Sequence, residues 1–201
     1  MTSSPSDTSD FDVDPALAAA VFEIETHAAE GGWDQPARLY ALVDTAQLVE
    51  REPALASLMG LDAASADGSL TPVEQELLTQ PLEEALESIT WPPDVAGCAA
   101  VVERLVLPPD VDDQIPDDPA AAEEFAREHP DRQEVRIVAG ATRAGSTYCA
   151  LRLRAHDDAQ SVVGGADLVP QLLGLLTATL HDDDGPDGPD GSEEAPVRKN
   201  Q

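Results

Sequence analysis

The fold of this chain is clearest in EVRIVAGATRAGSTYCALRLRA, residues 134–155. Apolar and polar side chains alternate over residues 134–142 and again over 147–155, which is typical of two β-strands with one buried face. The segment Ala144-Gly145-Ser146 between them supplies the glycine that a three-residue hairpin loop favours. The sequence therefore predicts an antiparallel hairpin in which Arg143 lies opposite Thr147.

The length of that loop determines which side chains share a face, because directly opposed residues of a hairpin lie on the same side. The apolar face then consists of Val135, Ile137, Ala139, Ala141, Cys149, Leu151 and Leu153. The opposite face consists of Arg136, Val138, Tyr148, Arg152 and Arg154. In this register Arg136 lies opposite Arg154, a like-charge pair that needs an acidic group nearby.

Helices and strands on both sides of the hairpin complete the fold. Helical periodicity and capping residues predict helices over residues 14–30, 45–60, 72–89, 119–128 and 167–180. Short apolar runs predict strands over residues 38–43 and 98–107. The order α-β-α-α-β-α-β-β-α predicts an α+β fold, in which helices cover a mostly antiparallel sheet of about four strands.

A single domain accounts for most of the 201 residues. Residues 1–13 and 182–201 contain too few apolar side chains to offset the entropy of ordering them, so we expect two disordered tails around a domain at 14–181. We find no signal-peptide pattern, and the longest apolar stretch, residues 168–180, is too short to span a bilayer. We therefore expect a cytoplasmic protein.

Charge narrows the range of partners. The chain contains 40 acidic and 11 basic residues, which gives a formal net charge of −29. Nucleic acids and anionic membranes bind proteins through clustered lysine and arginine, so we expect neither as a partner. Five of the basic residues nevertheless lie within residues 132–154, on or beside the hairpin.

Those arginines make the polar hairpin face the candidate binding site. Arginine and tyrosine are frequent in protein interfaces, and guanidinium groups match carboxylates and phosphates. The candidate binding residues are Arg136, Tyr148, Arg152 and Arg154. The alternative is that these arginines pair with carboxylates of the chain itself.

No pattern in the sequence predicts a catalytic residue, a metal ligand or a cofactor. Cys98 and Cys149 have no histidine at metal-ligand spacing, and we expect both thiols to be buried. The chain contains no Gly-x-Ser-x-Gly turn and no phosphate-binding loop. The acidic stretches 63–74 and 108–118 each lack ligands that a calcium loop requires, so solvated loops explain them better.

The last helix is apolar on more than one side. Its apolar residues are Leu168, Val169, Leu172, Leu173, Leu175, Leu176 and Leu180. Such a helix is either covered on both sides within one chain or packs against a second copy. A homodimer through this helix is therefore an alternative to burial within the monomer.

Three peptides resemble segments of a known family: LTPVEQE (70–76), ITWPPDVAGCAAVVERLVLPP (89–109) and HPDRQEVRIVAGATRAGSTYCALRLR (129–154). The resemblance is to small acidic proteins of high-GC Gram-positive bacteria, and it extends over about residues 15–180. It implies a protein of unknown function, without catalytic residues to transfer.

These observations favour a non-enzymatic protein-binding or adaptor module, similar in size and acidity to secretion chaperones. Its partner would be another protein or a second copy of the chain. The alternative is a binder of a small anionic ligand, or an enzyme, that uses the arginine-bearing face. Calcium sensing through the acidic loops is a third hypothesis.

Overall fold

The computed structural model describes residues 13–62, 64, 66–76 and 79–181. The expected tails, 1–13 and 182–201, lie outside this part of the chain except for Val13. The strands are β1 (Arg38–Asp44), β2 (Leu70–Glu74), β3 (Gly97–Val106), β4 (Gln133–Thr142), β5 (Thr147–Leu153) and β6 (Val163–Gly165). The helices are α1 (Pro15–Glu30), α2 (Thr45–Arg51), α3 (Pro53–Leu58), α4 (Leu82–Ser88), α5 (Pro119–Glu128) and α6 (Pro170–Leu180), with short 3-10 turns at 109–114, 154–156 and 159–161.

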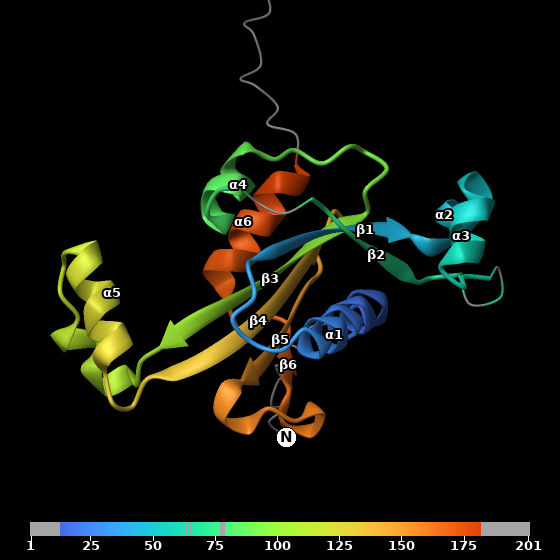
Figure 1. Cartoon of the computed structure of the whole chain (residues 1–201). Coiled ribbons are helices and arrows are strands. Elements are labelled where there is room, and N and C mark those ends of the chain that lie inside the picture. Colours follow the sequence, from blue (N-terminus) through green and yellow to red (C-terminus); the bar gives the residue numbers. More distant parts are fainter. Residues whose placement is uncertain (1–12, 63, 65, 77–78, 182–201) are drawn as a thin grey trace, which may run out of the picture.

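In the described part of the chain, six antiparallel strands form one sheet in the order β2-β1-β3-β4-β5-β6 (Figure 1). The prediction of about four strands is therefore wrong. The predicted helix over 72–89 overlaps the end of the edge strand β2, which precedes α4. Pro72 is tolerated in β2 because an edge strand need not donate every N–H group. Strand β6 has three residues, two of them glycine, so it shows no alternation in the sequence.

The hairpin of β4 and β5 is confirmed, with a register that differs from the predicted one by two residues. Arg136 pairs with Arg152, not with Arg154, and Ala141 pairs with Thr147. The loop turns through Gly145, whose φ is +89°, in the left-handed region that glycine tolerates best. A shift of two residues leaves every side chain on its predicted face.

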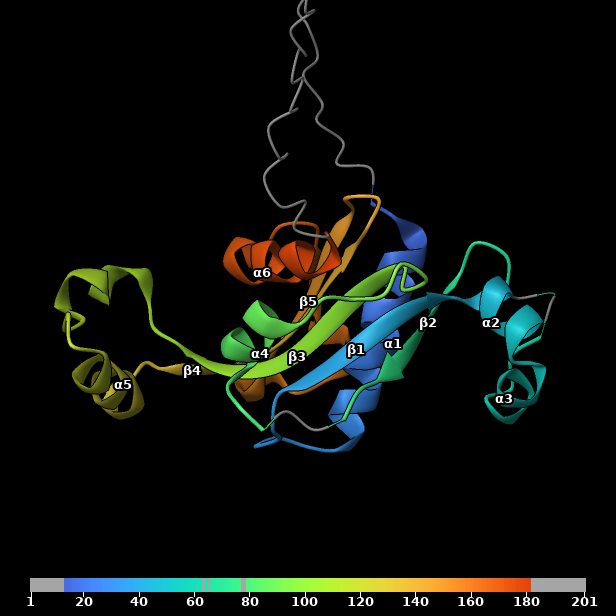
Figure 2. The ribbon, with the colours of Figure 1, turned by 90° about the horizontal axis from the view of Figure 1, so that it is seen from above.

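Helix α1 covers one face of the sheet, and α4 and α6 cover the other (Figure 2). Asp14 caps α1 as predicted, accepting hydrogen bonds from the N–H groups of Ala16 and Leu17. The helix packs closely because Gly140 of β4 lies beneath it. A Cβ atom at Gly140 would lie 3.0 Å from Val21 Cγ2 and 3.1 Å from Leu17 Cδ1.

The opposite face is covered by α6 together with α4. Helix α6 begins at Pro170 after Val169, so Asp167 is not its N-cap as predicted. Its buried leucines, Leu173, Leu176 and Leu180, pack on β3 and β4. The Trp91 indole N–H donates to Thr179 Oγ1 at 3.0 Å, which joins the segment before β3 to α6.

Two helical extensions lie at opposite ends of the sheet: α2 with α3 at one end, and α5 at the other (Figures 1 and 2). Helix α5 has no buried residue. None of the helices in the described ranges combines the length and hydropathy that a membrane span requires.

Candidate functional site

The structure brings three of the four candidate binding residues together. Arg136 of β4 and Arg152 of β5 lie beneath α1 and the segment that follows it, and Arg154 begins the 3-10 turn after β5. Tyr148 does not join them. Its ring packs on Phe22 of α1, with 5.9 Å between the ring centroids, and its hydroxyl oxygen lies close to Gly164 of β6.

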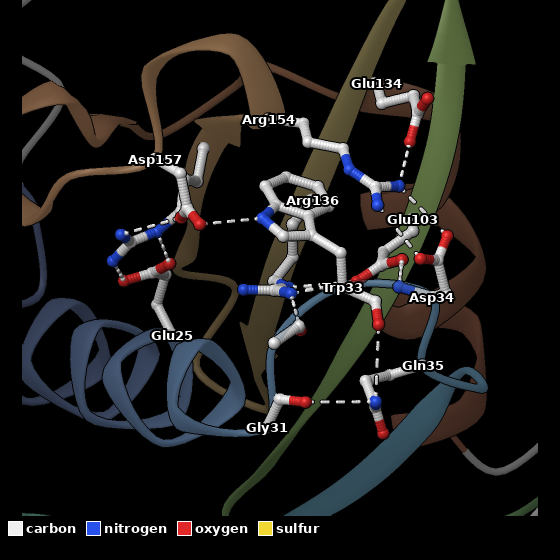
Figure 3. Close-up of polar contacts among 12 residues, drawn as sticks. Glu25, Gly31, Trp33, Asp34, Gln35, Glu103, Glu134, Arg136, Arg154 and Asp157 are labelled. Carbon is white, nitrogen blue, oxygen red and sulfur yellow. Dashed lines mark hydrogen bonds and ion pairs between the residues drawn. The ribbon is translucent and has the colours of Figure 1, made fainter.

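Trp33 lies between two of these arginines (Figure 3). The guanidinium carbon of Arg136 is 4.4 Å from the Trp33 ring centroid, and that of Arg154 is 5.6 Å away. The Trp33 indole N–H donates to Asp157 Oδ2 at 2.9 Å. We call Trp33 and the three arginines the arginine cluster. Trp33 was not among the candidate residues predicted from the sequence. The signal that could have pointed to it is its position directly after the helix-ending pair Gly31-Gly32.

Arg152 forms a two-pronged ion pair with Glu25 of α1. Its Nε and Nη2 atoms donate to Glu25 Oε1 and Oε2 at 2.5 and 2.8 Å, and both side chains are buried. A further contact reaches Asp157 Oδ1 at 3.3 Å. The hydrogen bonds to Glu25 raise the pKa of Arg152, so the guanidinium stays charged at any ordinary pH. This pair fixes α1 to β5.

Arg136 is 1% exposed and bonds to the strand beside it. Its Nη2 atom donates to Glu103 Oε1 at 2.9 Å and also to the carbonyl oxygen of Gly32. Within the described residues, its Nη1 atom is the one buried side-chain nitrogen or oxygen without a hydrogen-bond partner. Arg136 therefore holds the Gly32–Trp33 segment against β3 and β4.

Arg154, at 40% exposure, is the accessible member of the cluster. It donates to both carboxylate oxygens of Asp34, each at 3.0 Å, and to Glu134. The hydrogen bond from Arg154 lowers the pKa of Asp34. Asp34 has a φ of +64°, the one positive φ outside glycine in the described chain, and its N–H donates to Glu103 Oε2 at 2.7 Å.

The carboxylates around the arginine cluster outnumber its guanidinium groups. Its three guanidinium groups contact five carboxylates: Glu25, Asp34, Glu103, Glu134 and Asp157. Internal pairing, which the sequence left open as the alternative, is the arrangement found. That a partner binds Arg136, Tyr148, Arg152 and Arg154 stays a prediction.

The other arginines in the described ranges also bond to groups of the chain itself, either carboxylates or backbone carbonyls. Arginines paired with carboxylates are Arg38, Arg51, Arg104 and Arg127. Arg132 donates to the His129 carbonyl, and Arg143 donates to backbone carbonyls that include that of Val95 at 2.9 Å. Lysine occurs once, at position 199, outside the described residues. Each of the nine described arginines is therefore already hydrogen-bonded or ion-paired within the chain.

A different surface is open and apolar. A cavity of about 350 Å³ lies where α6 crosses β3 and β4, and we call it the α6 groove. Its lining residues are Glu83, Val102, Arg104, Ile137, Val169, Pro170, Gln171, Leu172 and Leu175. The volume is within the range of small-ligand pockets, and most of the lining is aliphatic. The ion pair between Arg104 and Glu83 supplies the charged part of the lining.

The groove exists because α6 is apolar on more than one side. Leu173 and Leu176 face the sheet, while Leu172 and Leu175 are half-buried and line the cavity. On β3, alternation places Val106 on the same face as Val102 and Arg104, and Val106 is 44% exposed. The sequence showed the excess of leucine on this helix but not the direction in which the surplus side chains point.

The two cysteines are buried and free. Burial raises the pKa of the Cys98 thiol to about 11 and also raises the pKa of Cys149. Thiols in this state are poor nucleophiles at neutral pH. Among the described residues, no group of three or more His, Cys, Asp or Glu side chains could hold a metal ion, and parts of the acidic stretch 63–74 lie outside them.

A family model described as PPA1309-like protein matches residues 17–181, which is most of the chain. The chain belongs to the PPA1309-like family. No curated protein and no solved structure matches it. The PPA1309-like family is uncharacterised, and its expected origin in high-GC Gram-positive bacteria stays a prediction. The matched range contains both the arginine cluster and the α6 groove.

Proposed function

We propose that this PPA1309-like protein is a non-enzymatic binding module that holds an apolar segment of a protein partner in the α6 groove. The observation that carries the proposal is the groove itself, an aliphatic cavity of about 350 Å³ between α6 and two central strands. Exposed apolar surface of this kind is retained in soluble proteins mainly where something binds.

The walls of the groove fit this role. Strands β3 and β4 form the centre of the sheet, and the side chains of Val102 and Ile137 are held there by the core. Leu172 and Leu175 come from a helix whose other side is fixed by Leu173 and Leu176. A site on rigid elements loses little conformational entropy on binding, which favours affinity.

The alternative, an anion binder or enzyme at the arginine-bearing face, receives less support. The guanidinium groups of Arg136, Arg152 and Arg154 contact five carboxylates, so an anion would enter a region of net negative charge. Binding there would also break the buried pair between Arg152 and Glu25, which is costly.

A site-specific photocrosslinker tests the proposal. It replaces Leu172 or Leu175 in the groove, and a matched variant carries it at Leu58 of α3, which is 86% exposed and lies on a different part of the molecule. After irradiation of the native host cells, we expect one discrete crosslinked protein from the groove positions and none from Leu58.

Equal crosslinking from all three positions, or none from the groove, would overturn the proposal. Homodimerisation through α6 is a separate outcome of the same experiment, since a crosslink between two copies of the chain has twice its mass. Analytical ultracentrifugation of the purified protein then distinguishes a stable dimer from a transient contact.

A further inference from the structure

We infer that the segment held in the α6 groove is basic and amphipathic, with apolar side chains that enter the groove and lysine or arginine residues beside them. This inference rests on the proposed function and adds the chemistry of the partner.

The rim of the groove is acidic on the side of α4. Glu83 lines the cavity, and Glu87 follows one turn later on the same side of the helix. The buried side of α4 is formed by Leu82, Ala85 and Leu86, which leaves its three glutamates on the outside. Arg104 pairs with Glu83 and balances its charge, so the negative charge beside the groove comes from the exposed α4 glutamates that do not line it, Glu87 in particular.

The rest of the protein strengthens the same preference. The chain contains 40 acidic and only 11 basic residues. Each described arginine already contacts a carboxylate or a carbonyl of the chain. A cationic segment therefore gains long-range attraction during approach and gains contacts at the rim. An acidic segment of equal hydrophobicity meets repulsion at both stages.

A second copy of the chain is disfavoured as the occupant by the same charges. Two molecules of net charge −29 repel one another, and α6, which would have to enter the groove of its partner, contains no lysine or arginine. The basic partner is accordingly a different polypeptide.

Three synthetic helical peptides of equal length test the inference on the full-length protein. One carries leucine on one face and lysine on the other, the second carries leucine and glutamate, and the third carries serine and lysine. Binding is measured by fluorescence anisotropy in 0.15 M salt. We expect the leucine–lysine peptide to bind at least tenfold more tightly than either of the others, because it alone supplies both features.

Variants locate the binding on the surface. Leu172→Glu should weaken binding of the leucine–lysine peptide more than tenfold, because it places a charge in the apolar cavity, while Leu58→Glu should leave it unchanged. Glu87→Gln should weaken it about threefold, and Glu50→Gln, on exposed α2, should have a smaller effect. Circular dichroism and thermal midpoints check that each variant is folded.

The possible results distinguish two claims: that the groove binds a segment, and that this segment is basic. Equal binding of the leucine–glutamate peptide, lost in Leu172→Glu, would overturn the basic partner and leave the groove as a binding site. Equal binding of the serine–lysine peptide would show attraction without the groove and would overturn the inference. Binding of the leucine–lysine peptide that Leu172→Glu leaves intact would overturn it as well.

Discussion

The arginine cluster and the α6 groove lie on opposite faces of one sheet. They differ in how many of their side-chain groups already have a partner within the chain. In the cluster, three guanidinium groups and Trp33 are held by five carboxylates and by α1. In the groove, Leu172, Leu175 and Val102 line a cavity that nothing else in the described chain fills. The arginine cluster contains residue types that are typical of binding sites, whereas the α6 groove contains apolar surface that no other part of the described chain covers.

This contrast separates side chains that already have partners within the chain from side chains that a partner could still cover. An arginine whose donors already meet a carboxylate has little to offer a ligand, whereas a half-buried leucine beside a cavity can still lose water on binding. The cluster therefore has a structural role in fixing α1 and the Gly32–Asp34 segment to the sheet.

The largest effect is expected from the buried ion pair. Arg152→Ala should lower the free energy of unfolding by about 3–5 kcal/mol, because it leaves the buried Glu25 carboxylate without its partner. Urea unfolding measures the change. The double variant Glu25→Gln with Arg152→Met should recover much of the loss, since no buried unpaired charge remains; the Asp157 carboxylate, which also contacts Arg152, is 46% exposed. A loss below about 1 kcal/mol for Arg152→Ala would contradict a structural role.

The second-largest effect on stability is expected from two leucines one turn apart on α6, Leu172 and Leu176. Leu176→Ala should cost about 3 kcal/mol, because the side chain is fully buried against the sheet. Leu172→Ala should cost about 1 kcal/mol or less, because its side chain lines the open groove. Equal losses in thermal or urea unfolding would mean that the groove is part of the core.

Gly140, beneath α1, and Gly174, on the exposed side of α6, differ in the atoms that an added methyl group would meet. Gly140→Ala should cost about 1–2 kcal/mol, because its Cβ would meet Val21 and Leu17 of α1 at 3.0 and 3.1 Å. Gly174→Ala on α6 should stabilise the protein by about 0.5–1 kcal/mol, since no atom beyond its chain neighbours and the adjacent backbone of α6 lies within 4 Å of the added Cβ and alanine favours the helix. A Gly140→Ala variant at least as stable as the parent protein would show that α1 is not closely packed on β4, and a destabilising Gly174→Ala would contradict the open space around Gly174.

The smallest effect concerns the pH dependence of the core beneath α6. The Cys98 thiol has a pKa of about 11 in the folded protein. In the unfolded chain the thiol is exposed to water and ionises at a lower pH. The unfolded chain thus loses this proton first, so stability should fall by about 1 kcal/mol as the pH rises from 9 to 10. Cys98→Ser should lack this component. Identical pH profiles for the two proteins would place the thiol in contact with water.

The hairpin over 134–155 was predictable because alternation and a glycine-containing loop are local signals. Its faces were also predictable, since they depend on parity alone, but its register was not, because Gly145 could take any of several places in the loop. Strands β2 and β6 were not predicted from the sequence, for a different reason. Pro72 and the pair Gly164-Gly165 form strands only because β1 and β5 offer them an edge to pair with.

The sequence by itself determined the acidity of this protein, the hairpin, the cap of α1 at Asp14 and the excess of leucine on α6, because each depends on composition or on residues close together in the chain. Only the tertiary structure decided which carboxylate meets which arginine, as with Glu25 and Arg152, which are 127 residues apart. It also decided where the surplus leucines face. Both are pairings over long distances in the chain, and no local pattern encodes them.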